Sequence, residues 1–448
     1  MGMVNGQGPF AGIAHSLRAL RGRNYALFFG GQSLSLVGTW MQTAALYWLV
    51  YKLSPTPDEG KVMLGWVAFV GQIPSLLVAP LAGVLSDRWD RHRVLLITQT
   101  LAMVQAGALA ALALSGAIQV HHVLLLSATL GLIMSVDIPN RQAFVSQVVD
   151  RREDLANAIA LNSLSFHMAR LVGPAVAGFV VEWSVLSGLS TQGEGMCFLL
   201  NAVSYLAVIA AVLAMRPSRR AVRTDRRPLL HELHEGWSYA VGFAPIRYLL
   251  LGLTLLGLTV LPYTTLMPVF ARDVLHGDAV TQGWLLSAAG LGAIVGALYL
   301  AGRRSILGLG TLMALLPLVL GTALVVFAFS RTLWLSLAMM VIVGGTLMVL
   351  MGGCNTLLQT LVDDDKRGRV MSLYAIAFIG TTPFGSLVVG YLARHLGADW
   401  ALAIDGGLLV LICLAGLPHL PRLRDQVRPI YRSMGFVEDP PPPPAVEA

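Results

Sequence analysis

Charged residues are scarce in this chain of 448 residues. Only 12% of the residues are Asp, Glu, Lys or Arg, whereas 56% are hydrophobic. Ordinary soluble domains contain about 25% charged residues and about 45 to 50% apolar residues. A water-soluble fold of this length could not bury so much apolar surface, so the composition excludes a soluble globular protein.

Cysteine and the common enzyme signatures are also scarce. The three cysteines, Cys197, Cys354 and Cys413, fall inside apolar runs and have no CxxC or Cys/His spacing. That pattern fits neither a disulfide framework nor a zinc site. No GxxxxGK[ST] phosphate loop occurs, and residues 231–236 (HELHEG) lack the HExxH spacing of zinc hydrolases. We therefore predict no metal site and no cofactor.

Long apolar stretches follow one another along the chain, with short polar breaks between them. A helix needs roughly 20 apolar residues to cross the hydrocarbon core of a bilayer. We predict twelve such spans, at residues 25–50, 63–85, 94–114, 121–142, 157–182, 196–215, 247–270, 281–301, 306–329, 332–361, 369–393 and 400–420. The predicted fold class is an all-α membrane protein with two six-helix bundles.

The basic residues predict the orientation of these spans, because Lys and Arg accumulate in cytoplasmic loops. If both termini are cytoplasmic, the breaks on the outer side contain only Lys52, Lys61, Arg272, Arg331 and Arg394. We therefore predict a multi-pass protein of the cytoplasmic membrane with both termini inside. The net charge of +7 is spread over the breaks, which argues against a nucleic-acid partner.

The polar breaks divide the chain into five parts. Residues 1–24 are predicted to be a cytoplasmic segment, and residues 25–215 and 247–420 the two bundles. Residues 216–246 form a cytoplasmic linker with an amphipathic helix, and residues 421–448 a cytoplasmic, Pro-rich disordered tail.

A weak internal repeat supports the two halves. Residues 148–152 (VVDRR) follow the fourth span, and residues 361–367 (LVDDDKR) follow the tenth. Each segment has the same place in its six-span unit, as a parallel duplication requires.

The loop between the second and third spans carries the most specific motif. Residues 83–93 read GVLSDRWDRHR, with a basic cluster of Arg88, Arg91 and Arg93. Gly83 lets two helices approach closely, and Asp87 can meet the positive N-terminal end of another helix.

This motif resembles the loop motif of the major facilitator superfamily. The resemblance implies that Asp87 braces the inner gate against the start of the eleventh helix, near residues 369–372. Two departures weaken it, because Asp90 replaces the usual second glycine and the matching loop at residues 302–304 has no acid.

A second motif lies in the fifth span, where residues 170–178 read RLVGPAVAG. Gly173, Pro174 and Gly178 make a helix that can kink and pack closely. The motif resembles the Gly-Pro motif of drug and proton antiporters, which favours export. With GTWMQ at 38–42, DIPNRQ at 137–142, LMPVFAR at 266–272 and RGRVMS at 367–372, the chain resembles the subgroup of the enterobactin exporter and macrolide efflux proteins.

Charges within the spans are few. An ionised group near the bilayer centre costs roughly 2.5 to 3.5 kcal/mol on insertion scales, so each one is a functional hypothesis. Arg170 lies half way along the fifth span, and Asp137 lies near the inner end of the fourth. We predict that Asp137 and Arg170, with Arg141 nearby, form a coupling ion pair that a proton or substrate breaks. Asp405 is interpreted as lying at a solvated helix end.

The resemblance implies that spans one, four, seven and ten line a substrate cavity. The predicted substrate contacts are Gln32, Trp40, Gln42, Tyr263, Asn355 and Gln359. A cavity so short of fixed charge suits a bulky, amphipathic, neutral or weakly charged solute.

The predicted function is a secondary active transporter, a monomer in membrane lipid. It exports a small amphipathic molecule, such as a siderophore, drug or other metabolite, by alternating access. A proton gradient is the predicted energy source. Two alternatives stay open: a transport-inactive membrane sensor or receptor, and a membrane-embedded lipid-handling enzyme on the same scaffold.

Overall fold

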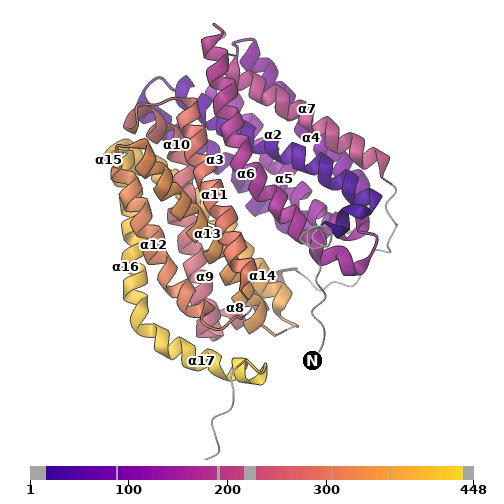
Figure 1. Cartoon of the computed structure of the whole chain (residues 1–448), viewed down its shortest axis with the longest axis vertical. Coiled ribbons are helices and arrows are strands. Elements are labelled where there is room, and N and C mark those ends of the chain that lie inside the picture. The colour runs from indigo at the N-terminus through magenta and orange to yellow at the C-terminus, as the bar shows by residue number, and fades with distance from the viewer. Residues whose placement is uncertain are drawn as a thin grey trace, which may run out of the picture.

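The computed structural model describes residues 17–86, 89–188, 192–215, 229–303, 305–363 and 365–436. These residues are almost all helical, and the helices form two halves that follow one another along the chain (Figure 1). The first half contains α2 (Arg23–Leu53), α3 (Pro57–Ser86), α4 (Arg91–Leu114), α5 (Val120–Val148), α6 (Leu155–Leu186) and α7 (Gly193–Ala214). The second half contains α9 (Ala244–Leu255), α11 (Ala279–Gly302), α12 (Leu309–Phe329), α13 (Leu333–Leu361), α14 (Arg367–Ala375), α15 (Thr382–Leu396) and α16 (Ala398–Gly416).

Eleven helical segments of the described residues are long and apolar enough to cross a membrane. The other long helix is α2, which has 31 residues. Between its ends, α2 carries the polar side chains Gln32, Ser33, Ser35, Thr39, Gln42 and Thr43. With α2 included, the helical segments match the twelve predicted spans one for one, so the predicted all-α membrane fold is confirmed.

The seventh and eleventh spans are broken helices. After α9, the seventh span continues through η3 (Leu256–Val260), η4 (Leu261–Leu266), α10 (Met267–Val269) and η5 (Phe270–Val274), which alternate between π and tighter turns. Pro262 and Pro268 lack a backbone N–H, so each removes a helical hydrogen bond. The eleventh span is interrupted between α14 and α15 by the π turn η6 (Ile376–Gly380).

Helices pack mainly within their own half. In the first half, α2 contacts α6 and α7, and α4 contacts α5 and α7. In the second half, α11 contacts α13, and α12 contacts α13 and α16. The two largest contacts between the halves are α6 with α11 and α3 with α15, and smaller ones join α2 to α10 and α11. The relation between the halves therefore depends on a small number of helix contacts.

Both described ends of the chain lie on one face, which we call the terminal face; the other is the opposite face. The terminal face carries η1 (Arg18–Arg21), α8 (Leu229–Gly242) and α17 (Leu420–Ser433), the last two toward the bottom of Figure 1. Helix α8 occupies the segment where an amphipathic helix is predicted.

The predicted disorder of the tail is wrong for residues 421–433, because they form α17. Residues 437–448, like residues 1–16 and the basic linker segment 216–228, lie outside the described residues.

Candidate functional site

Asp137 lies fully buried on α5, inside the first half. Its Oδ1 accepts hydrogen bonds from Thr98 Oγ1 at 2.7 Å and Gln99 Nε2 at 2.8 Å, both on α4. The guanidinium of Arg141, one turn along α5, lies 3.2 Å from Oδ2. The carboxylate therefore has a cation and two neutral donors, which a buried charge requires.

Arg170 does not belong to this cluster, so the predicted contact between Asp137 and Arg170 is wrong. Its guanidinium donates a hydrogen bond to Tyr263 Oη at 3.0 Å and lies 5.6 Å from the centre of the Trp40 ring. Trp40 in turn packs edge-on against Phe166. Among the described residues no carboxylate forms an ion pair with Arg170. An intramembrane cation of the first half therefore contacts η4 of the second half.

The predicted substrate contacts divide into exposed and buried side chains. Trp40 and Asn355 are partly exposed, Gln359 is exposed, and Gln359 donates a hydrogen bond to Asn355 on α13. Tyr263 is 1% exposed. Among the described residues, its hydroxyl forms a hydrogen bond with the Arg170 guanidinium. Trp40, Asn355 and Gln359 therefore remain candidates for direct contact.

Gln32 and Gln42 are buried, with 2% and 3% of their surfaces exposed. Gln42 Oε1 accepts a hydrogen bond from Asn201 Nδ2 at 2.7 Å, and Gln42 Nε2 donates to Gln105 Oε1 at 3.4 Å. These bonds join α2 to α7 and α4. In this conformation Gln32 and Gln42 are therefore not accessible, and their contact with substrate stays a prediction.

Asp405 is also placed differently from its prediction. It lies on α16 with 6% of its surface exposed, and its Oδ2 has no hydrogen-bond partner. The interpretation as a solvated helix end is therefore wrong. Sequence position gave no signal here, because Asp405 lies only two turns from the start of α16, where either environment is possible.

The glycines of the fifth-span motif lie at close helix contacts. A methyl group added at Gly173 would lie 2.6 Å from Trp40 Cβ on α2, within the first half. One added at Gly178 would lie 2.7 Å from the carbonyl oxygen of Ala279, and one at Gly283 would lie 2.6 Å from that of Pro174. Real Cβ atoms do not approach so closely, so this motif permits contact between α6 and α11 across the two halves.

The second contact between the halves, α3 with α15, also depends on glycine. A methyl group at Gly65 would lie 2.6 Å from the carbonyl oxygen of Ser386, and one at Gly390 would lie 2.9 Å from that of Lys61. Like the contacts of Gly178 and Gly283, these lie in the part of each helix nearest the opposite face.

Polar contacts also join the two halves near the opposite face. Tyr51 donates a hydrogen bond to Asp273 from the end of α2 to η5, and Arg272 lies 5.9 Å from the centre of the Tyr51 ring. Gln282 Nε2 on α11 donates to the carbonyl oxygen of Ala44 on α2 at 3.0 Å. The two halves are therefore closed against each other on the opposite face.

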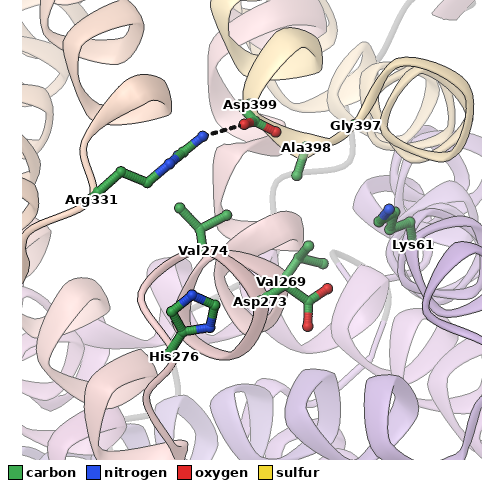
Figure 2. Close-up of a pocket in the computed structure, with 9 residues that line it drawn as sticks. All are labelled: Lys61, Val269, Asp273, Val274, His276, Arg331, Gly397, Ala398 and Asp399. Carbon is green, nitrogen blue, oxygen red and sulfur yellow. Dashed lines mark hydrogen bonds and ion pairs between the residues drawn. The ribbon is translucent and has the colours of Figure 1, made fainter.

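A charged cavity of about 250 Å³ lies beside this closure (Figure 2). Lys61 reaches it from α3 of the first half, and Asp273, His276, Arg331 and Asp399 reach it from the second half. Arg331 is paired with Asp399 at 2.6 Å. Lys61 is paired with Asp58 at 2.8 Å, and Asp58 is not drawn in Figure 2. Most of the charged side chains that line this cavity are thus paired within the protein.

Part of the predicted gating motif cannot be described structurally, because Asp87 and Arg88 lie outside the described residues. Gly83 lies in the last turn of α3, and Arg91 and Arg93 begin α4. Asp90, the departure from the family pattern, caps α4 by accepting a hydrogen bond from the backbone N–H of His92 at 3.0 Å. The gating role of this motif stays a prediction.

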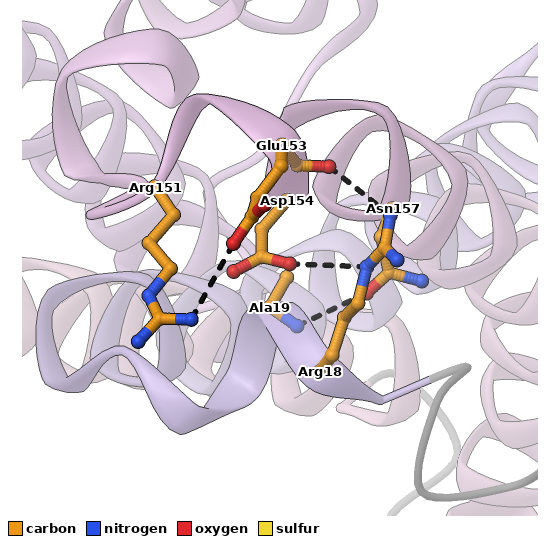
Figure 3. Close-up of polar contacts among 6 residues, drawn as sticks. All are labelled: Arg18, Ala19, Arg151, Glu153, Asp154 and Asn157. Carbon is orange, nitrogen blue, oxygen red and sulfur yellow. Dashed lines mark hydrogen bonds and ion pairs between the residues drawn. The ribbon is translucent and has the colours of Figure 1, made fainter.

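On the terminal face, the short element before each half binds the loop between the fourth and fifth spans of that half. In the first half, Arg18 of η1 pairs with Asp154 at 3.0 Å, and the backbone N–H of Ala19 donates to Asn157 Oδ1 at 3.0 Å (Figure 3). In the second half, Glu235 of α8 pairs with Arg369 at the start of α14.

A further bond of α8 extends this arrangement, since Tyr239 Oη donates to Asp363 Oδ2 at 3.3 Å. Burial raises the pKa of Tyr239, so its phenol keeps the proton that it donates. The loops bound in this way contain the two segments of the predicted internal repeat, 148–152 and 361–367. The ion pairs at the two sites have opposite polarity.

Comparison with known proteins agrees with this architecture. Residues 14–431 match the family described as transmembrane secretion effectors. The staphyloferrin A transporter of Staphylococcus aureus is 25% identical over 389 residues, which cover 86% of this chain and 93% of that protein. The multidrug efflux pump Tap of Mycolicibacterium fortuitum is 26% identical over 398 residues, which cover 87% of this chain and 93% of the pump.

Solved structures with low sequence identity share the fold. A bacterial homologue of the iron transporter ferroportin has a TM-score of 0.66 and 17% identity, covering 88% of this chain and 98% of that one. A bacterial homologue of the human lysosomal transporter Spinster has a TM-score of 0.64 and 13% identity, covering 97% and 100%. The chain therefore belongs to the transmembrane secretion effector family of the major facilitator superfamily, as a multi-pass membrane transporter and not an enzyme.

Proposed function

We propose that the protein exports a small amphipathic molecule by alternating access of its two halves. The observation that supports this is the position of the glycine contacts at Gly65, Gly178, Gly283 and Gly390, all near the opposite face. Tight helix contacts near one side of a membrane close that side, and transport requires that they separate while the other side closes. The relatives named for a siderophore and for drug efflux support the substrate class.

The proposed orientation puts the terminal face in the cytoplasm of a bacterial cell. Arg18, Arg151, Arg152, Arg369 and Arg424 all lie on that face, as cytoplasmic loops require. In that orientation the contacts described above close the outer side of the protein.

In this proposal the substrate reaches Trp40 and Arg170 from the terminal face. The Trp40 and Phe166 rings offer an apolar, polarisable surface, and Arg170 is the nearby fixed charge. Asn355, which is partly exposed, and Gln359, which is exposed, add polar groups of the second half. Such a site suits an amphipathic solute with a few polar groups.

We further propose proton antiport, with Asp137 as the proton acceptor and no cofactor. A proton on Asp137 would weaken its attraction to Arg141, the cation one turn along α5. The two neutral donors, Thr98 and Gln99, would keep the uncharged group hydrogen-bonded.

Inverted membrane vesicles test both parts of the proposal, with ethidium as the transported probe. An imposed acid interior should drive ethidium uptake by the parent protein. Asp137→Asn should remove the dependence on the pH gradient, whereas Glu153→Gln, an exposed acid on the terminal face, should keep it.

The outcomes separate the parts. If Asp137→Asn responds to the gradient as the parent does, Asp137 is not the coupling residue. If the parent moves no ethidium or other amphipathic dye in either condition, the export proposal fails in favour of a transport-inactive receptor.

A further inference from the structure

A second cavity lies away from the contacts between the halves. It has a volume of about 610 Å³ and is bounded by α17 and by the ends of α9, α12 and α13 on the terminal face. We call it the α17 cavity. Helix α17, which bounds this cavity, lies toward the bottom of Figure 1, on the terminal face.

The wall of the α17 cavity is largely apolar. Leu249 of α9, Met313 and Ala314 of α12, and Leu357 and Leu361 of α13 contribute to it. Protein interiors are packed as densely as organic crystals, and an apolar space of this size offers water few partners. The wall therefore suits an apolar occupant, such as an acyl chain.

The cavity also has two arginines, Arg424 and Arg428, one turn apart on α17. Both are exposed, and neither forms a hydrogen bond or ion pair with the described residues. Asp425 lies between them and also lines the cavity, so the lining has two positive charges and one negative charge. Guanidinium groups bind phosphate oxygens through two parallel hydrogen bonds.

Helix α17 has the pattern of a helix that lies in the membrane interface. Leu420, Leu423, Val427 and Ile430 recur at helical spacing, whereas Arg422, Arg424 and Arg428 are exposed. Arg424 and Arg428 flank the apolar side, and a helix with such apolar and basic surfaces lies at the depth of the phospholipid headgroups. Basic pockets between membrane helices at this depth bind anionic headgroups.

We propose that the α17 cavity binds one anionic phospholipid from the leaflet on the terminal face. An acyl chain lies against Leu249, Met313 and Leu357, and the headgroup phosphate contacts Arg424 and Arg428. The site is separate from the transport pathway and does not depend on which solute the protein moves. Its occupant joins α17 to α9 and α12, the helices that α17 contacts directly.

Purified full-length protein in detergent provides the test. Phosphatidylglycerol and phosphatidylcholine with identical acyl chains are added, and bound lipid is measured by native mass spectrometry together with the melting temperature. Phosphatidylglycerol should form a one-to-one complex and raise the melting temperature, and phosphatidylcholine should bind much more weakly.

Charge-removing variants identify the site. The Arg424→Gln/Arg428→Gln variant should lose about tenfold or more of its phosphatidylglycerol affinity, since each charged hydrogen bond is worth more than a neutral one. The matched control is Arg151→Gln/Arg152→Gln, which removes two exposed arginines from the same face of the first half. It should bind as the parent does. Equal affinity for both double variants would overturn the proposal.

A cavity-filling variant keeps the test decisive if the arginine variant does not fold. Ala314→Phe leaves both arginines and occupies part of the apolar wall, so it should also weaken phosphatidylglycerol binding. Glycerol 1-phosphate, which has the phosphate without acyl chains, should not raise the melting temperature. If it stabilises the protein as well as the lipid does, or if Ala314→Phe binds lipid normally, the cavity is not a phospholipid site.

Discussion

Asp137 and Arg141 form a charge pair on one face of α5. Residues four apart lie next to each other on a helix, so the pair could be predicted from its spacing. The contributions of Thr98 and Gln99 could not, because they come from α4. Inside a bilayer no water satisfies polar groups, so these hydrogen bonds offset part of the free-energy cost of burying the pair.

This arrangement predicts a large effect of removing one partner. Asp137→Leu leaves Arg141 with 19% of its side chain exposed and no counter-charge. It should destabilise the protein by about 3 to 5 kcal/mol. Asp137→Leu/Arg141→Leu should recover most of that loss. Thermal unfolding in detergent measures both, and equal melting temperatures for the single and double variants would contradict the pairing.

Removing the carboxylate of Asp405 should have the opposite effect on stability. Its Oδ2 is buried and has no hydrogen-bond partner, so its polar group is buried at a cost that no partner offsets. Asp405→Leu, similar in size and apolar, should leave the melting temperature unchanged or raise it. A clear fall in melting temperature, comparable with that of Asp137→Leu, would show that Asp405 has a stabilising partner.

At the scale of helices, the existence of each span could be predicted, but its buried face could not. A run of about 20 apolar residues is enough to predict a span. In α2, however, polar residues occur on several faces, so nothing in the sequence separates Gln42, which bonds to Asn201, from Trp40, which is partly exposed. Which side faces a cavity depends on tertiary contacts.

Helix α17 was missed for a different reason. Its four arginines and Pro429 resemble a polar tail, and the Pro-rich segment follows closely. The signal that could have found it is the spacing of Leu420, Leu423, Val427 and Ile430. The breaks in the seventh span had a clearer signal in Pro262 and Pro268.

The glycine contacts predict that two similar substitutions differ in effect. Gly178→Ala adds a methyl group that meets the Ala279 backbone, whereas Gly107→Ala on α4 adds one in open space. Gly178→Ala should therefore weaken closure of the opposite face, and Gly107→Ala should not. The measurement is labelling of Ala44→Cys, in a background without other cysteines, by a membrane-impermeant maleimide.

Labelling of Ala44→Cys should be faster with Gly178→Ala because Ala44 is 4% exposed in the closed arrangement. Equal rates with the two alanine variants would show that α11 moves aside to accept the methyl group. In that case the contact between α6 and α11 does not limit opening.

For the whole molecule, the two halves are similar in plan but differ in their internal contacts. Each half is bound by a short preceding element at the loop before its fifth span, through Arg18 and Asp154 in one and Glu235 and Arg369 in the other. The repeat visible in the sequence predicts the equivalent loops. It does not predict the reversed polarity, because the partners lie far away in the chain.

Alternating access predicts that joining the halves on the opposite face stops transport. Gly178→Cys/Ala279→Cys, in a background without Cys197, Cys354 and Cys413, places two thiols where α6 meets α11. Oxidation should reduce ethidium transport to background, and a reductant should restore it.

The control for this experiment is a disulfide within one half. Val181→Cys/Gly193→Cys joins α6 to α7, where a methyl group at Gly193 would lie 2.7 Å from Val181 Cα. It adds the same kind of cross-link to the same helix but leaves the relation between the halves free, so transport should persist after oxidation. If both cross-linked proteins transport equally well, the halves need not separate at α6 and α11. Movement would then have to occur within each half, for which the broken seventh and eleventh spans are the available hinges.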